Sequence, residues 1–153
     1  RRGVILGGWM RLHDRGREVL NKWKKSNQFA LRELAAFAEK EVCLVAEAPH
    51  EWLFPRCCCT VHHGGAGTTA AALRAGVPTI VVPLGYDQTY HGEWVESLGV
   101  GVKCSTVMEV QELEFREALR RATSEPGMAE RSREVAATLR QEPGVAGAVA
   151  QIR

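Results

Sequence analysis

Short apolar runs alternate along this chain with longer stretches in which apolar residues recur at helical spacing. Apolar runs bounded by turn residues are typical of buried strands, whereas a repeat of about 3.6 residues is typical of amphipathic helices. The runs predict strands over residues 3–6, 42–46, 59–62, 79–82 and 100–104. Because strands and helices alternate, the pattern indicates an α/β fold with a parallel sheet flanked by helices.

Helical periodicity connects the predicted strands. An amphipathic helix within a charged helical region, residues 14–41, is predicted by the spacing of Leu31, Leu34, Ala35 and Ala38. A capping box, Thr-Val-Met-Glu at 106–109, predicts the start of a later helix, because its first and last side chains can bond the free N–H groups there. The remaining predicted helices are a short turn over 50–54, helices over 70–75 and 87–98, and two that close the chain.

A glycine-rich turn follows the third predicted strand. The segment Val61-His62-His63-Gly64-Gly65-Ala66-Gly67-Thr68-Thr69 runs from an apolar strand end into a helix of small residues. Glycine allows positive φ and a close approach of ligand to the main chain, and the start of the helix offers N–H groups without partners. Gly76 can end the helix, and Val77-Pro78 leads into the next strand. The resulting βαβ unit predicts a phosphate site at the carboxyl edge of the sheet.

Other uses of the glycine turn fit less well. A P-loop requires Lys before its Ser or Thr, and Gly67 stands there instead. The pattern Gly65-x-Gly67-x-x-Ala70 does satisfy the relaxed dinucleotide fingerprint, and Asp87 lies at about the distance of a ribose carboxylate. However, such an acid should close the second strand of its unit, whereas residues 83–86 separate Asp87 from that strand. A turn for packing alone is disfavoured because two adjacent histidines are poor packing material.

The motifs around the glycine turn resemble a known family. The segments concerned are residues 48–55, 61–69, 73–78 and 87–88. Together they resemble the donor-binding half of the UDP-sugar glycosyltransferases of GT-B fold, and most of all the sterol 3-β-glucosyltransferases and related bacterial and fungal enzymes. Residues 140–145 resemble the closing segment of that family, so the resemblance covers about residues 48–153. It implies a Rossmann-like α/β fold, the C-terminal half of a GT-B glycosyltransferase.

The resemblance also implies a UDP-sugar site. Its residues are Ala48, His50, His63, Ala66, Gly67, Thr68, Asp87 and Gln88. The main chain of Ala48 would read the uracil edge, and His50 would reach the nucleotide from the same turn. His63 matches the diphosphate histidine of the family, while His62 alternates to the other side of the strand and is expected to pack.

Residues after the histidine pair complete the expected site. Ala66, Gly67 and Thr68 would offer main-chain N–H groups and one hydroxyl to the phosphate oxygens. Asp87 and Gln88 match the pair that binds the hexose in the resembling enzymes, although an Asp at that point could also be only a helix N-cap. A Glu that clamps the ribose in the plant enzymes is replaced here by Ala71, which puts ribose recognition in doubt.

Two departures from the family pattern limit the expected activity. The connection before the second predicted strand is longer than in the family and predicts a helical insertion over about residues 11–40. The chain also starts at the family's second donor-domain strand, so the first strand and helix and the acceptor domain are expected to be missing. The resemblance places the catalytic base in that missing half. No catalytic residue is therefore expected in this chain, and the fragment alone is expected to be inactive.

Composition agrees with one domain and excludes several classes. The chain has 153 residues, a formal net charge of +2 and no long basic run, which argues against nucleic acid as a partner. No transmembrane segment or signal peptide is recognised, so a cytoplasmic setting is expected, with peripheral membrane attachment as an option for a full-length protein. The cysteines lack the C-x-x-C spacing of zinc sites, and no metal or other cofactor is expected.

These features predict a donor half that binds a UDP-sugar, with UDP-glucose as the favoured donor. The complete enzyme is expected to transfer the hexose, with inversion, to a hydroxyl acceptor such as a sterol or another lipid. One alternative is a nucleotide-sugar-binding subunit that is non-catalytic or depends on a partner. A second alternative is the NAD-binding domain of an oxidoreductase.

Overall fold

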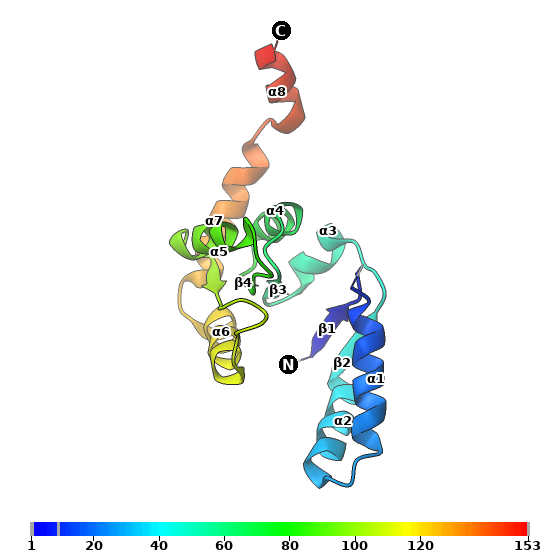
Figure 1. The fold of residues 1–153 in the computed structure, drawn as a ribbon. Helices are drawn as coiled ribbons and strands as arrows, with labels where there is room; N and C mark the ends of the chain where they lie inside the picture. Colours follow the sequence, from blue (N-terminus) through cyan, green and yellow to red (C-terminus); the bar gives the residue numbers. More distant parts are fainter. Residues whose placement is uncertain (1, 9, 153) are drawn as a thin grey trace. The chain divides into compact units, whose positions relative to one another are not determined.

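The computed structural model describes residues 2–8 and 10–152. Contacts along the chain divide it into two compact units, residues 1–49 and residues 50–153, which are drawn in blue to cyan and in cyan to red in Figure 1. A single domain over residues 1–153 stays a prediction.

The N-terminal unit is a small parallel sheet with a pair of helices. Its elements are β1 (Gly3–Leu6), α1 (Leu12–Lys24), α2 (Phe29–Glu41) and β2 (Val42–Val45). The strands pair in parallel with Gly3 opposite Val42, and the two helices run side by side (Figure 1). An ion pair between Lys24 and Glu39 joins the helices. The charged region predicted to be helical thus forms two helices.

The C-terminal unit contains a three-stranded parallel sheet. Its elements are α3 (His50–Leu53), η1 (Phe54–Arg56), β3 (Thr60–His62), α4 (Ala66–Ala75), β4 (Thr79–Val81), α5 (Gln88–Ser97), β5 (Gly101–Lys103), α6 (Glu112–Ser124), α7 (Met128–Gln141) and α8 (Gly144–Ile152). The strand order is β3-β4-β5, with Thr60 opposite Thr79 and Thr79 opposite Gly101. All the predicted strands are present. Among the described strands, β1 and β2 form the sheet of the N-terminal unit, and β3, β4 and β5 form that of the C-terminal unit.

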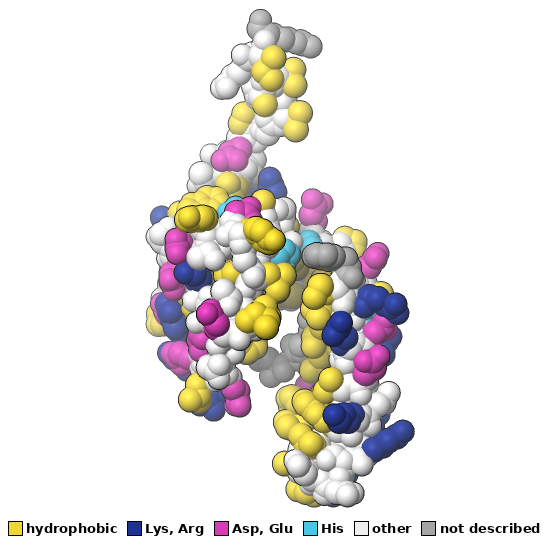
Figure 2. Space-filling model, in the orientation of Figure 1, with side chains coloured by type: hydrophobic (Ala, Val, Ile, Leu, Met, Phe, Trp, Pro, Cys, Tyr) yellow, Lys and Arg dark blue, Asp and Glu magenta, His cyan; other side chains and the backbone are white. Residues whose placement is uncertain are grey.

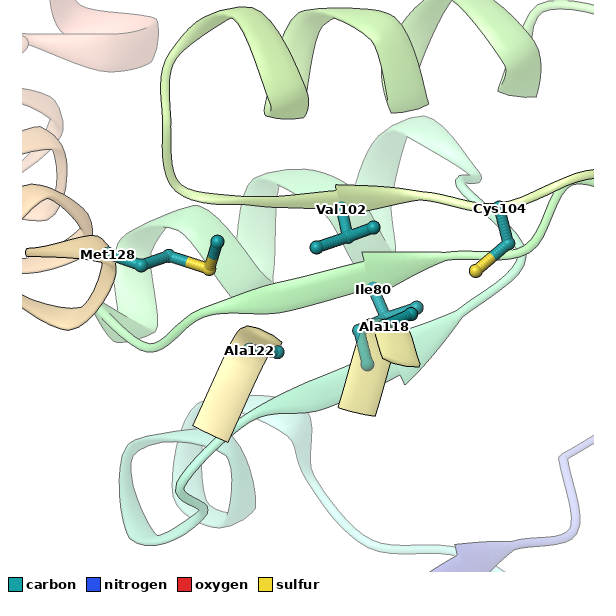
Figure 3. Packing of buried hydrophobic residues seen from close by; sticks show 6 residues of the cluster. All are labelled: Ile80, Val102, Cys104, Ala118, Ala122 and Met128. Atoms are coloured by element: carbon teal, nitrogen blue, oxygen red, sulfur yellow. The ribbon is translucent and has the colours of Figure 1, made fainter. Parts of the chain in front are cut away.

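The central strand β4 is buried on both faces. On one face Ile80 packs in a cluster with residues of β5, α6 and α7 and with Cys104, which directly follows β5 (Figure 3): Val102, Cys104, Ala118, Ala122 and Met128. On the other face Val81 packs with Leu73 of α4 and Val95 of α5. Helices on both faces explain why this strand reads as a continuous apolar run.

The predicted capping box does not begin a helix. The hydroxyl of Thr106 donates to the carboxylate of Glu109 at 2.8 Å, but the N–H groups of Glu109 and Val110 donate to the Thr106 carbonyl and close a turn. The helix α6 begins only at Glu112. The predicted start was wrong because Glu114, in the first turn of α6, accepts the N–H of Ser105 at 2.6 Å and fixes the loop in front of the helix.

The surface of the C-terminal unit is charged but mixed in sign. Figure 2 shows Asp and Glu side chains interspersed with Lys and Arg over its visible face. The unit also contains exposed ion pairs such as Arg131 with Glu134. The helix α8 differs, because apolar side chains line it and no residue of it is buried. Across residues 2–8 and 10–152, helices of the length and apolarity needed to span a bilayer are absent.

Candidate functional site

The N-terminus of α4 lies directly after β3 and is not capped by a side chain. Gly65 occupies the N-cap position with extended backbone angles, φ −61° and ψ 140°. Its carbonyl accepts both the N–H and the hydroxyl of Thr69, at 2.9 and 3.0 Å. The N–H groups of Ala66, Gly67 and Thr68 come before that first bond of the helix and have no acceptor within it. The start of α4 therefore presents three consecutive amides.

Ligand can approach these amides closely. Ala66 and Gly67 are exposed, and a Cβ atom built on Gly67 would meet no heavy atom within 4 Å. Amides and the positive end of the helix dipole together favour an anion at this position. The structure thus brings together the three residues predicted to bind phosphate oxygens.

Gly64 sets the shape of the turn. Its φ is +91°, a conformation that side chains with a Cβ rarely adopt. A Cβ atom there would also stand 2.8 Å from Cγ1 of Val81 and 3.0 Å from the carbonyl oxygen of Gln88. Only glycine fits, because both the backbone angle and the neighbouring atoms exclude a side chain.

His62 turns into the protein, as its place in the strand predicts. Its Nδ1 accepts the N–H of Gly64 at 3.0 Å, and its Nε2 lies 2.9 Å from the hydroxyl of Thr79. Burial, together with the nearby His63 and His50, lowers the pKa of His62 to about 4. The ring is therefore neutral at pH 7 and, since Nδ1 accepts, its proton lies on Nε2. Thr79 also accepts the hydroxyl of Thr60 at 2.7 Å, so the network is closed inside the sheet.

His63 lies on the glycine turn itself. Its ring is half-buried and covers Gly65 so closely that a Cβ atom on that glycine would stand 2.5 Å from Nε2 of His63. The two adjacent histidines thus have different surroundings: one braces the strand end and the other lies against the N-cap of α4. This separation agrees with a diphosphate role for His63, which stays a prediction.

His91 is part of the turn although the sequence analysis did not select it. The residue lies in α5, and its Nδ1 is 2.6 Å from the carbonyl oxygen of Gly64. A carbonyl can only accept, so Nδ1 of His91 carries the proton. A single histidine inside a helix has no motif around it. The only signal in the sequence was its place one helical turn after Asp87, at i+4.

Asp87 and Gln88 lie beside the glycine turn. The Oε1 atom of Gln88 accepts the N–H groups of Leu84 and Gly85, at 2.8 and 3.3 Å, so this end of the amide holds the loop before α5. Asp87 occupies the N-cap position of α5, but its side chain makes no capping hydrogen bond and is exposed. The carboxylate of Asp87 and the NH₂ end of Gln88 are the groups that a sugar could bind. Their predicted sugar contacts are untested.

The predicted nucleotide residues fall in both units. His50 begins α3, and its ring stacks on that of Phe54 with 4.5 Å between centroids and 14° between planes. Phe54 is buried, so this stack fixes the imidazole of His50 at the surface of the C-terminal unit. Ala48 belongs to the N-terminal unit. Its contact with uracil stays a prediction.

A hollow away from the glycine turn does not suit a diphosphate. It lies at the end of β5 and is lined by Lys103, Cys104, Thr106 and three carboxylate residues, Glu96, Glu109 and Glu114. Its negative charge would repel phosphate oxygens. Apart from the masked positions 1, 9 and 153, the chain places no three His, Cys, Asp or Glu side chains so that they could hold a metal ion.

Comparison with known proteins gives one family over most of the chain. Residues 18–152 match the family described as Erythromycin biosynthesis protein CIII-like, C-terminal domain. A sterol 3-beta-glucosyltransferase of Aspergillus clavatus is 46% identical over 112 residues, which are 73% of this chain and 8% of that protein. A sterol 3-beta-glucosyltransferase of Pichia angusta is 36% identical over 134 residues, 88% of this chain and 11% of that protein. The chain thus spans about a tenth of these relatives.

Solved structures agree with these matches. The glycosyltransferase VinC, solved in complex with DTDP, superimposes with a TM-score of 0.70 at 25% identity and covers 99% of this chain, which is 40% of that one. The rhamnosyltransferase SpnG superimposes with a TM-score of 0.72 at 18% identity. The predicted α/β fold, with parallel sheets flanked by helices as in the C-terminal half of a GT-B glycosyltransferase, is confirmed.

Proposed function

The chain belongs to the Erythromycin biosynthesis protein CIII-like C-terminal domain family, and on that premise we propose that it forms the nucleotide-sugar donor site of a glycosyltransferase. The observation that carries the proposal is the glycine turn at the start of α4, where the N-cap is Gly65 and the space over Gly67 is open. There the amides of Ala66, Gly67 and Thr68 stand free beside the ring of His63. With the family established, dinucleotide binding by this turn is set aside.

The donor diphosphate binds at these amides, which thereby hold the leaving group of the transfer. Breaking the bond between sugar and β-phosphate leaves negative charge on the departing nucleoside diphosphate. Donors fixed in advance around that charge stabilise the transition state more than the ground state. His63 and the amides of Gly67 and Thr68 supply such donors without a metal ion. The hydroxyl acceptor and the catalytic base belong to other parts of a complete enzyme.

UDP-glucose is the proposed donor, and a sterol or similar lipid alcohol is the proposed acceptor class. The fungal relatives are sterol 3-beta-glucosyltransferases, which supports glucose as the transferred sugar and a sterol as the acceptor. VinC was solved in complex with DTDP, which supports a dTDP-sugar as the competing donor. Asp87 and the NH₂ end of Gln88 bind hexose hydroxyls, since a carboxylate accepts and an amide nitrogen donates. The acceptor hydroxyl attacks the sugar directly, so the transfer proceeds with inversion.

Calorimetric titration of the chain with UDP, UDP-glucose, dTDP and NADH tests the proposal. We expect the uridine nucleotides to bind more tightly than dTDP and NADH. Preference for dTDP would change the donor, and preference for NADH or absence of nucleotide binding would refute the donor site.

Substitution of His63 tests the geometry of the proposed site. We expect His63→Ala to weaken UDP binding by about 1.5–3 kcal/mol, the range for a hydrogen bond to a charged group, and to leave uridine binding unchanged. Arg74→Ala is the matched control, because Arg74 is exposed at the opposite end of α4. Equal losses in the two variants would contradict the assignment of His63.

A further inference from the structure

Two histidines from different elements hold the two main-chain polar groups of Gly64. The N–H of Gly64 donates to Nδ1 of His62 at 3.0 Å, and its carbonyl accepts from Nδ1 of His91 at 2.6 Å. His62 ends β3, whereas His91 lies one turn inside α5. Each ring is half-buried. Gly64, whose backbone is intrinsically flexible because it lacks a Cβ atom, therefore has both its N–H and its carbonyl held by side chains.

These bonds act on the direction of the phosphate-binding amides. Gly64 has φ +91°, and the free amides begin two residues later at Ala66. A glycine without side-chain partners populates positive and negative φ about equally. Rotation about Gly64 would swing the start of α4 away from its place beside His63. The two imidazoles remove that freedom before ligand binds, which is the condition for strong electrostatic stabilisation of a leaving group.

The bond from His91 also joins two parts of the site. Asp87 and Gln88 open the helix that carries His91, and Gly64 belongs to the turn before α4, 27 residues away in the sequence. The backbone carbonyl of Gln88 would stand 3.0 Å from a Cβ atom on Gly64, so the two segments already touch there. A hydrogen bond at this contact fixes the distance between the phosphate-binding amides and the pair proposed to bind the hexose.

We propose that His91 is a positioning residue for the donor site. Through the hydrogen bond from its Nδ1–H to the Gly64 carbonyl, it holds the glycine turn at a fixed distance from Asp87 and Gln88. His62 performs the matching role on the N–H side of Gly64. The inference rests on the proposed donor function for its effect on ligand. The hydrogen bond between His91 and Gly64, and the tautomer of His91 that it requires, do not depend on that function.

Substitution of His91 by asparagine and by leucine distinguishes a role of its hydrogen bond to Gly64 from a role of its packing. In asparagine the side-chain nitrogen is attached to Cγ, as Nδ1 is in histidine, so His91→Asn keeps a donor in nearly the same place. Leucine fills similar space without a donor. We expect His91→Leu to weaken UDP binding about tenfold, about 1.4 kcal/mol, while uridine binding changes little. His91→Asn is expected to retain UDP binding within about twofold to threefold of the unsubstituted chain.

Nitrogen-15 NMR of the imidazole rings tests the bond without any nucleotide. We expect His91 to carry its proton on Nδ1 and His62 to carry its proton on Nε2, because Gly64 accepts from one ring and donates to the other. This measurement keeps the inference testable if His91→Leu fails to fold. A neutral His91 with its proton on Nε2 would overturn the proposed bond.

The outcomes of the two tests are distinguishable. If the unsubstituted chain fails to bind UDP, the donor function is refuted, and the tautomers still decide whether the bond exists. If the chain binds UDP and His91→Leu binds it equally well, the positioning role is refuted while the donor function stands. Equal losses in His91→Asn and His91→Leu would likewise refute it, because the donor atom would then be irrelevant. Rescue by asparagine together with the expected tautomers supports it.

Discussion

The two ends of α4 are built in opposite ways. At its C-terminus Gly76 is buried in the left-handed conformation against Ala136 of α7, and the Arg74 carbonyl accepts Nη2 of Arg140 at 3.0 Å. At its N-terminus Gly65 offers no side-chain cap, and the space over Gly67 is empty. The lack of a side-chain cap is shared by α1, α2, α5, α6 and α7, so what distinguishes this end is the open space over Gly67 beside the glycine turn. We propose that ligand supplies the partners of the amides there.

Glycine at the bottom of the open turn is the most sensitive position in this comparison. Gly64→Ala forces a side chain into φ +91° and places Cβ 2.8 Å from Val81. Left-handed strain and overpacking together predict a loss of about 3–5 kcal/mol in the free energy of unfolding. Urea denaturation measures it, and the UDP affinity of whatever protein folds is expected to fall as well. Unchanged stability would mean that the turn adopts another conformation.

Acid weakens the strand end that supports the turn. The pKa of His62 is about 4 in the folded chain, against 6.5 for the unperturbed side chain. Between these values the unfolded chain binds a proton that the folded chain excludes, so the free energy of unfolding falls as the pH falls from 6.5 to 4. The expected contribution is about 3 kcal/mol, fully present above pH 6.5 and lost below pH 4.

His62→Asn isolates this effect from the titration of carboxylates. Asparagine offers Oδ1 to the N–H of Gly64 from the same place as Nδ1, but it does not titrate. Denaturation curves at pH 7, 5.5 and 4 are expected to converge for the two proteins as the pH falls. A constant difference between them would show that His62 titrates normally in the folded chain.

The sequence predicted those elements whose conformation depends on residues close to them along the chain. The strand β4 could be located because a strand buried on both faces needs an unbroken apolar run. The start of α4 could be located because glycines allow a tight turn and small residues allow a helix to follow it. The delayed start of α6 depends on Glu114 bonding Ser105 across nine positions.

The candidate site shows the same limit. His62 was placed correctly by alternation along a strand, which is a property of the backbone. His91 could not be selected, because its hydrogen-bond partner is a main-chain carbonyl 27 residues earlier. Every residue has such a carbonyl, so the residue type gives no indication of the bond. For Gln88 the residue type indicated hydrogen bonding, but only the structure shows that its Oε1 binds the loop at Leu84.

The closed end of α4 provides the control for the open end. Gly76→Ala places a Cβ atom at φ +71° and 3.2 Å from Cβ of Ala136. We expect the free energy of unfolding to fall by about 1–2 kcal/mol, from left-handed strain and a tight contact. UDP affinity of the folded protein, measured by calorimetry well below the melting temperature, is expected to stay the same. A matching loss of affinity would show that the two ends of the helix are coupled.

The smallest change in stability tests the open end most directly. Gly67 is helical and nothing lies within 4 Å of its missing Cβ, so Gly67→Ala is expected to raise the free energy of unfolding by about 0.5–1 kcal/mol through helix propensity. Cβ atoms of a helix tilt toward its N-terminus, so the new methyl group occupies the space through which phosphate would approach the amides. UDP affinity is therefore expected to fall while stability rises. Such opposite signs separate ligand binding from folding, because a substitution that damaged the turn would lower both. If UDP affinity were unchanged, the diphosphate could not lie over Gly67, and the donor site would have to be placed elsewhere on the C-terminal unit.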